Sequence, residues 1–152
     1  MSDNQKYLAK GHMLQRILKL PFLYLAWFAP HKRLRVFFHR LRGVKIGKNV
    51  EIGYFCFIGN VHPQMITIED NAVITAKVTI LEHDNSYYYT NRGNVKFGKV
   101  TIGNGAFIGI SAVIMPGVTI GANAIIGALT FINKNIPANA IVAGNPARLL
   151  KK

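Results

Sequence analysis

The chain has 152 residues, of which 50% are hydrophobic and 16% are charged, and this composition excludes a disordered chain. Its single cysteine, Cys56, excludes a disulfide framework and a multi-cysteine metal site. The formal net charge of +13 favours an anionic partner, which is a membrane surface, a nucleic acid or an anionic substrate. No uncharged apolar run reaches the roughly 18 residues that a membrane-spanning helix needs.

The first 43 residues form a basic segment with a net charge of +8, from nine Lys or Arg residues and one acid, Asp3. Apolar residues recur there at the spacing of one helical face: Leu34, Phe37, Phe38 and Leu41. An aromatic stretch at 22–28 precedes them. Two interpretations stay open, a helical cap on the following domain or a contact with a membrane surface or another subunit. Nucleic acid is not expected, because no recognised binding module accompanies the charge.

From residue 46 onward an aliphatic residue recurs every six positions. Twelve units begin in this way, at Ile46, Ile52, Ile58, Ile68, Ile74, Ile80, Ile102, Ile108, Ile114, Ile120, Ile126 and Ile132. Glycine follows the isoleucine in seven units, and we expect it to supply positive φ at a corner. The fifth residue of each unit is small or aliphatic, except at His62 and Asp84. A period of six fits neither an amphipathic helix nor an alternating strand, but it fits a triangular solenoid.

The units group by threes into four predicted coils, at 46–63, 68–85, 102–119 and 120–137. Inserts at 64–67 and 86–101 both follow a third unit, so both leave the solenoid from the same corner. The two residues that break the repeat, His62 and Asp84, hold the same place in adjacent coils and are expected to lie close together. A loop as long as 86–101 in a compact solenoid is more often functional than not.

This pattern resembles that of the hexapeptide-repeat acyltransferases over residues 44–150. The tail is also similar to the closing motif of sugar and serine O-acetyltransferases of that family: Ile141-Val142-Ala143-Gly144-Asn145-Pro146-Ala147-Arg148. The resemblance implies a mainly β fold, a left-handed parallel β-helix of about four to five coils over residues 44–152. Residues 1–43 would form the N-terminal helical segment, and Cys56, at an inward place, would be part of the core.

By this resemblance His83 matches the family's catalytic histidine, which lies just before an extended loop. Histidine suits the role, because a sugar hydroxyl attacks a thioester only when a base accepts its proton, and an imidazole with a pKa near 6.5 can do so. Asp84 is predicted to orient the ring, with Glu82 as the alternative, since neighbours on a strand point to opposite faces. His62 is the rival base. A zinc site of the γ-carbonic anhydrase type is not expected, because the residue five after His83 is Tyr88.

Acetyl-CoA binding is implied by the likeness of the last coils to galactoside acetyltransferase-like enzymes. The residues matched to the cofactor are Phe107 at the thioester end, the backbone amide of Ala128 at the pantetheine arm, and Lys134, Arg148 and Lys151 near the phosphates. In the long loop, Asn85, Tyr87 and Arg92 are the predicted sugar-binding residues, and a role for the loop in subunit contacts stays open.

The predicted activity is therefore acetyl transfer from acetyl-CoA to a sugar hydroxyl, in surface polysaccharide biosynthesis. The resemblance implies a homotrimer with its active site between subunits. An N-acetyltransferase on an amino sugar or nucleotide-sugar, a serine-type O-acetyltransferase and a non-catalytic scaffold are the alternatives. The expected location is the cytoplasm, at the inner face of the membrane if residues 1–43 contact lipid.

Overall fold

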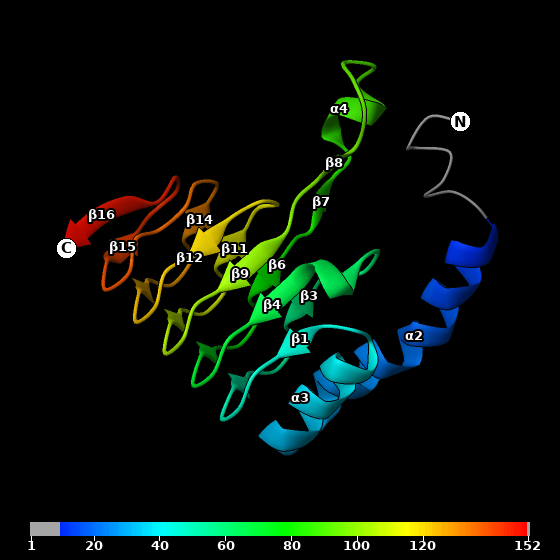
Figure 1. Ribbon diagram of the computed structural model, residues 1–152, viewed down its shortest axis with the longest axis horizontal. Helices are drawn as coiled ribbons and strands as arrows, with labels where there is room; N and C mark the ends of the chain where they lie inside the picture. Colours follow the sequence, from blue (N-terminus) through cyan, green and yellow to red (C-terminus); the bar gives the residue numbers. More distant parts are fainter. Residues whose placement is uncertain (1–9, 152) are drawn as a thin grey trace.

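The computed structural model describes residues 10–151, with side chains from 17 to 150. Two helices, α2 (Lys10–Phe28) and α3 (Lys32–Leu41), lie at one end of a solenoid of short strands (Figure 1). The strands of the first two coils are β1 (Lys45–Ile46), β2 (Glu51–Ile52), β3 (Phe57–Ile58), β4 (Ile66–Ile68), β5 (Val73–Ile74) and β6 (Thr79–Ile80). Those of the later coils are β9 (Val100–Ile102), β10 (Phe107–Ile108), β11 (Val113–Ile114), β12 (Thr119–Ile120), β13 (Ile125–Ile126), β14 (Phe131–Ile132) and β15 (Ile141–Ala143).

Three parallel sheets make the sides of the solenoid, in the orders β1-β4-β9-β12, β2-β5-β10-β13-β15 and β3-β6-β11-β14. The first residues of the predicted units pair from coil to coil, for example Ile46 with Ile68 and Ile102 with Ile120. The grouping by threes and the left-handed parallel β-helix are thus confirmed. A partial fifth coil follows, in which Ile136 bridges to Ile120, and β16 (Arg148–Lys151) then turns back antiparallel to β15.

The isoleucines that begin the units fill the interior of the prism, and most of them are fully buried. Cys56 is also buried among them, as predicted, and burial raises the pKa of its thiol to about 11. The same core includes Val36 from α3, so the helical segment and the solenoid share one apolar interior. The division of the chain between residues 43 and 44 stays a prediction.

The repeat glycines have a different role from the one expected. Of the seven, only Gly59 has a positive φ, while the left-handed corners fall two residues later, at positions such as Asn49, Phe55 and Leu129. A Cβ on Gly109 would lie 2.6 Å from the backbone nitrogen of Ala128 in the next coil, and Gly53 meets the backbone of its neighbouring coil in the same way. These glycines therefore permit the close approach of successive coils, and the expectation of positive φ was wrong for six of the seven.

Two insertions leave the corner between the third and first sheets, as the spacing predicted. The first holds the short 3₁₀ helix η1 (Pro63–Met65). The second is an arm whose base is the antiparallel pair β7 (His83–Asp84) and β8 (Lys96–Phe97), with the short helix α4 (Ser86–Tyr89) near its end. The arm projects well away from the solenoid (Figure 1). The chain re-enters the sheets at Val100, so the last two residues of the predicted loop 86–101 belong to β9.

Two arginines of helix α3, with Arg42 just after it, close the open end of the solenoid. The strand carbonyls of the first coil, which have no preceding coil to bond, accept hydrogen bonds from these side chains: Arg40 bonds Ile46, Arg35 bonds Ile52 (2.6 Å) and Arg42 bonds Ile58 (3.1 Å). The indole of Trp27 adds a hydrogen bond of 2.8 Å to the carbonyl of Cys56. A capping role for the helices is thus built into the fold. No helix in residues 10–151 is long and apolar enough to cross a membrane.

Candidate active site

Glu82 is a fully buried carboxylate at the corner where the second coil gives rise to the arm. Its Oε1 atom accepts three backbone N–H groups from the preceding coil, those of Asn60 (3.1 Å), Val61 (2.7 Å) and His62 (2.9 Å). Burial alone would raise the pKa of Glu82, but the contact with His83 and the amide hydrogen bonds outweigh it and lower the pKa to about 2. Glu82 is therefore a fixed negative charge at neutral pH.

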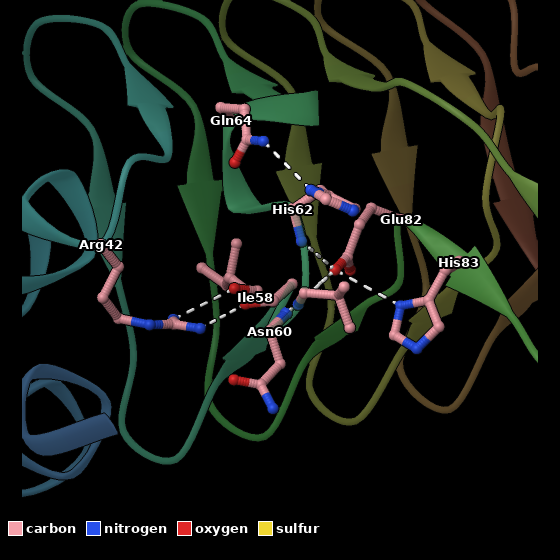
Figure 2. A network of polar contacts seen from close by, with 9 residues as sticks. Arg42, Ile58, Asn60, His62, Gln64, Glu82 and His83 are labelled. Atoms are coloured by element: carbon pink, nitrogen blue, oxygen red, sulfur yellow. Dashed lines mark hydrogen bonds and ion pairs between the residues drawn. The ribbon is translucent and has the colours of Figure 1, made fainter. Parts of the chain in front are cut away.

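His83 lies directly beside this carboxylate (Figure 2). Its Nδ1 atom is buried and lies 3.3 Å from Oε1 of Glu82, a distance at the long end for a hydrogen bond. The side chain as a whole is 18% exposed, and Nε2 is on the edge of the ring that points away from Glu82 (Figure 2). An imidazole held in this way has one nitrogen directed at an anion and the other available to a reacting group.

Asp84, the predicted orienting residue, does not face the imidazole. Its Oδ1 atom accepts the backbone N–H of Ser86 at 2.8 Å, at the start of α4. That hydrogen bond, together with Lys96 and His83 nearby, holds the pKa of Asp84 below its usual value. Of the two carboxylates considered from the sequence, Glu82 is the one in contact with the ring. Asp84 stabilises the first turn of the arm.

Phe97 packs between the two histidines of this corner. Its ring lies nearly parallel to that of His83, with centroids 6.0 Å apart, and meets that of His62 edge-on at 5.4 Å. His62 is buried, and its Nδ1 atom lies 3.2 Å from the amide nitrogen of Gln64. His62 and His83 thus both pack against the strand that returns from the arm, while the expected proximity of His62 and Asp84 stays a prediction. His62 is enclosed by its surroundings, whereas His83 keeps an exposed edge.

The corner is supported from the helical cap by Arg42. The guanidinium is fully buried and donates to the carbonyls of Ile58 and Gly59 (Figure 2). Burial lowers the pKa of Arg42 to about 10, with the charge of Glu82 acting in the opposite direction. His39 lies against the same guanidinium at 3.0 Å, and burial together with Arg42 lowers the pKa of His39 to about 3. The negative charge of Glu82 thus partly offsets the effect of burial on the Arg42 guanidinium.

The predicted sugar-binding residues lie on or next to the arm. Tyr87 and Arg92 are exposed and Asn85 is half-buried just before α4. The ammonium of Lys96 lies 3.6 Å above the ring of Tyr87, which ties α4 to the base of the arm. The arm that carries these residues projects away from the solenoid (Figure 1).

The residues matched to coenzyme A are divided between two edges of the prism. Phe107 lies on the outer face of β10 between Val73 and Ile125, and the exposed Ala128 follows β13. Arg148 is on β16, at the far end of the same sheet. Lys134 is exposed on the edge that carries His83, two coils further on, a rise of about 10 Å. Lys151 pairs through its backbone with Ile141. A single chain therefore does not bring all of these residues together.

Within residues 10–151 no three His, Cys, Asp or Glu side chains are placed to hold a metal ion. His83 and Glu82 form an imidazole–carboxylate pair, which is an arrangement suited to acid–base chemistry.

Comparison with known proteins identifies the family. The model for the bacterial transferase hexapeptide family (six repeats) matches residues 99–134. The galactoside O-acetyltransferase of Escherichia coli is 35% identical over 129 residues, covering 84% of this chain and 61% of that protein. The chain belongs to the hexapeptide-repeat acyltransferase family. It spans about three fifths of the length of the curated relatives it matches.

Solved structures of this family share the fold. A galactoside acetyltransferase in complex with coenzyme A is 25% identical, with a TM-score of 0.73 over 95% of this chain and 83% of that one. A hexapeptide-repeat acetyltransferase from Vibrio cholerae has the same TM-score at 23% identity, over 95% of this chain and 93% of that chain.

Proposed function

We propose that the protein is an acetyl-CoA-dependent O-acetyltransferase that acts on a sugar hydroxyl. The observation that carries the proposal is the contact between His83 and the ionised, buried Glu82, since it leaves the other ring nitrogen of His83 available as a base. The likeness to galactoside O-acetyltransferase supports the sugar class and the acyl donor.

In the proposed reaction, Nε2 of His83 accepts the proton of the acceptor hydroxyl as its oxygen attacks the thioester carbonyl. The C–S bond then breaks, and the coenzyme A thiolate takes the proton back from the imidazolium. The products are an acetyl ester and free coenzyme A thiol. Glu82 holds the ring and stabilises its transient positive charge. Asp84 remains on the arm in this scheme, outside the reacting groups.

Coenzyme A is proposed to bind through the residues matched from the sequence. Phe107 would lie at the thioester end, the amide of Ala128 at the pantetheine arm, and Lys134, Arg148 and Lys151 at the phosphates. Because these residues occupy two edges of one chain, we propose a homotrimer in which His83 of one subunit faces coenzyme A held partly by its neighbour.

The acceptor is proposed to be a sugar of a surface polysaccharide or its precursor, held by Asn85, Tyr87 and Arg92 of the arm. The aromatic and hydrogen-bonding groups of these residues are suited to a carbohydrate. A position at the inner face of a membrane, through contact of residues 1–43 with lipid, is part of this proposal.

Release of free thiol from acetyl-CoA, measured across sugars, amino sugars, nucleotide-sugars and serine, tests the proposal. We expect turnover with a sugar hydroxyl and a loss of about 10²-fold or more in kcat for His83→Ala. His62→Ala is the matched control, because His62 is the buried histidine of the same corner. A folded His83→Ala protein with wild-type kcat, or a larger loss of kcat in His62→Ala, would show that His83 is not the base. Turnover with serine or an amine alone would favour the other acetyltransferase classes.

A further inference from the structure

Helix α3 buries polar side chains against the solenoid and leaves apolar side chains exposed. Its charged and polar residues Arg35 and His39, with Arg42 just after it, are buried against the solenoid. Three of its apolar residues, Leu34, Phe37 and Leu41, are each between 43% and 50% exposed, while Val36 packs into the core. The outward side of this helix therefore carries exposed apolar side chains, while its buried polar side chains cap the strands.

Helix α2 has an outward apolar face as well. Exposed large side chains recur along one side of it, at Ile17, Leu18, Tyr24, Leu25 and Phe28. Where the two helices meet, a groove of about 410 Å³ is lined only by apolar or aromatic residues, among them Tyr24, Leu34 and Phe38. We call the exposed apolar residues of α2 and α3 the outer face of the cap. Such a patch on a single chain marks a binding surface.

The positive charge around the outer face indicates what kind of partner binds there. Between Asp3 and Glu51 the sequence contains eleven Lys or Arg residues and no acid. Several of the basic side chains are exposed on or beside the cap, namely Arg33, Lys45 and Lys48. A second copy of the chain would bring an equally basic segment against this one, and like charges would oppose that contact. An anionic surface is favoured instead.

We propose that the outer face of the cap lies on the surface of an anionic lipid bilayer. The aromatic and aliphatic side chains enter the headgroup region, and the surrounding basic side chains face the lipid phosphates. The helices do not need to cross the bilayer to bind in this way. In a threefold assembly the three caps lie at the same level along the symmetry axis, so three weak contacts add to one stronger attachment.

Attachment of the cap to a bilayer would favour a particular kind of acceptor. This part of the inference rests on the proposed function. His83 belongs to the second coil, so it is only about 10 Å along the solenoid from the capped end. A sugar carried on a lipid anchor would be presented close to the arm, whereas a free sugar would gain nothing from the attachment. We therefore expect the acceptor to be a sugar carried on a membrane-bound lipid.

Co-sedimentation of the full chain with lipid vesicles tests the attachment. Vesicles of phosphatidylcholine alone are compared with vesicles that also contain phosphatidylglycerol, at low and high salt. We expect strong binding only to the anionic vesicles, weakened by salt. Leu18→Ser/Leu25→Ser/Phe37→Ser should lower the partition coefficient at least tenfold, and Arg33→Gln/Lys45→Gln should lower it about tenfold on anionic vesicles only.

Tyr89→Ser is the matched control, because it removes an exposed aromatic side chain from the arm and leaves the cap intact. It should bind vesicles like the wild type. The proposal is overturned if the wild type does not sediment with anionic vesicles, or if the triple variant binds as well as the wild type. It is also overturned if sedimentation velocity shows that the triple variant only dissociates an assembly of copies. Thiol release with a water-soluble sugar, measured without vesicles, reports separately on the proposed activity.

Discussion

Phe97 is the cross-strand partner of His83 at the base of the arm, and its ring lies nearly parallel to the imidazole with centroids 6.0 Å apart. The pairing fixes one face of the imidazole while Glu82 fixes its Nδ1 edge. The position of the proposed base thus depends on two coils and on the strand that returns from the arm.

Replacing Phe97 with alanine should therefore lower kcat by about tenfold, because the imidazole loses the surface that holds its orientation. The KM for acetyl-CoA should stay near the wild-type value, since the matched coenzyme A residues are elsewhere on the prism. Steady-state kinetics of Phe97→Ala beside Tyr89→Ala, which alters only the exposed part of the arm, makes the comparison. An unchanged kcat in Phe97→Ala would show that the stacking has no role in turnover.

The two carboxylates beside His83 should differ sharply in their effect on catalysis. Glu82→Gln keeps an oxygen that can accept the three backbone amides but removes the charge that faces the ring. We expect kcat to fall at least tenfold with little change in either KM. Asp84→Asn should retain kcat within about twofold, because Asp84 bonds only the start of α4. Steady-state kinetics of both variants, with circular dichroism to confirm folding, decides between them. Equal losses in the two would contradict the assignment.

Contacts to coenzyme A can be tested at its phosphates. Lys134→Ala and Arg148→Ala should raise the KM for acetyl-CoA more than they change the KM for the acceptor. Both should also flatten the preference for coenzyme A over its 3′-dephospho form, because a lost cation removes the interaction that the phosphate makes. Competition by the two compounds in the thiol-release assay measures this preference. If it is the same in the wild type and in both variants, the proposed phosphate site is wrong.

Stability should fall in acid in two steps. Below about pH 6.5 the unfolded chain protonates His39, which burial keeps neutral in the folded protein until about pH 3. Below about pH 4.5 the unfolded chain also protonates Glu82, whose folded pKa is about 2, and stability of about 3 kcal/mol present at neutral pH is lost. Urea unfolding from pH 7 to pH 2 follows both steps. Glu82→Gln should remove the second step and leave the first, and retention of both steps in that variant would refute the explanation.

Glycines of two kinds should respond differently to alanine. A Cβ on Gly109 would meet backbone atoms of the next coil at 2.6 Å, so Gly109→Ala should cost about 2–4 kcal/mol of unfolding free energy. Gly117 has a φ of +83° and open space around a Cβ, so Gly117→Ala should cost only about 1–2 kcal/mol, from its left-handed backbone. Urea unfolding of both variants measures the difference. A larger loss at Gly117 would mean that coil spacing is not the limiting constraint.

The solenoid could be predicted from the sequence because each unit contains the same two features. These are an inward isoleucine such as Ile108 and a residue small enough for the next coil to approach. The register of coils and the corner of both insertions followed from counting alone. The reason for the glycines did not, because positive φ and lack of space both favour glycine. Only the backbone distances at positions such as Gly53 separate the two causes.

The surroundings of His83 were harder to predict, because they combine residues that no periodic pattern connects. Glu82 was named only as an alternative to Asp84, since alternation along a strand does not say which of two neighbours turns inward at a corner. Arg42 and Phe97 were not anticipated at all. Arg42 reaches the corner from the cap and Phe97 from the far end of a long insertion, and neither carries a local sequence signal.

The three arginines that cap the first coil also close that end of the stack of coils. A stack of parallel coils presents, at its first turn, the same row of unsatisfied carbonyls that would template the addition of another strand. The guanidinium groups of Arg35, Arg40 and Arg42 occupy those acceptors, so the first coil does not present an open edge to another strand. Loss of these side chains would leave the first coil as an unprotected sheet edge, open to pairing with another strand.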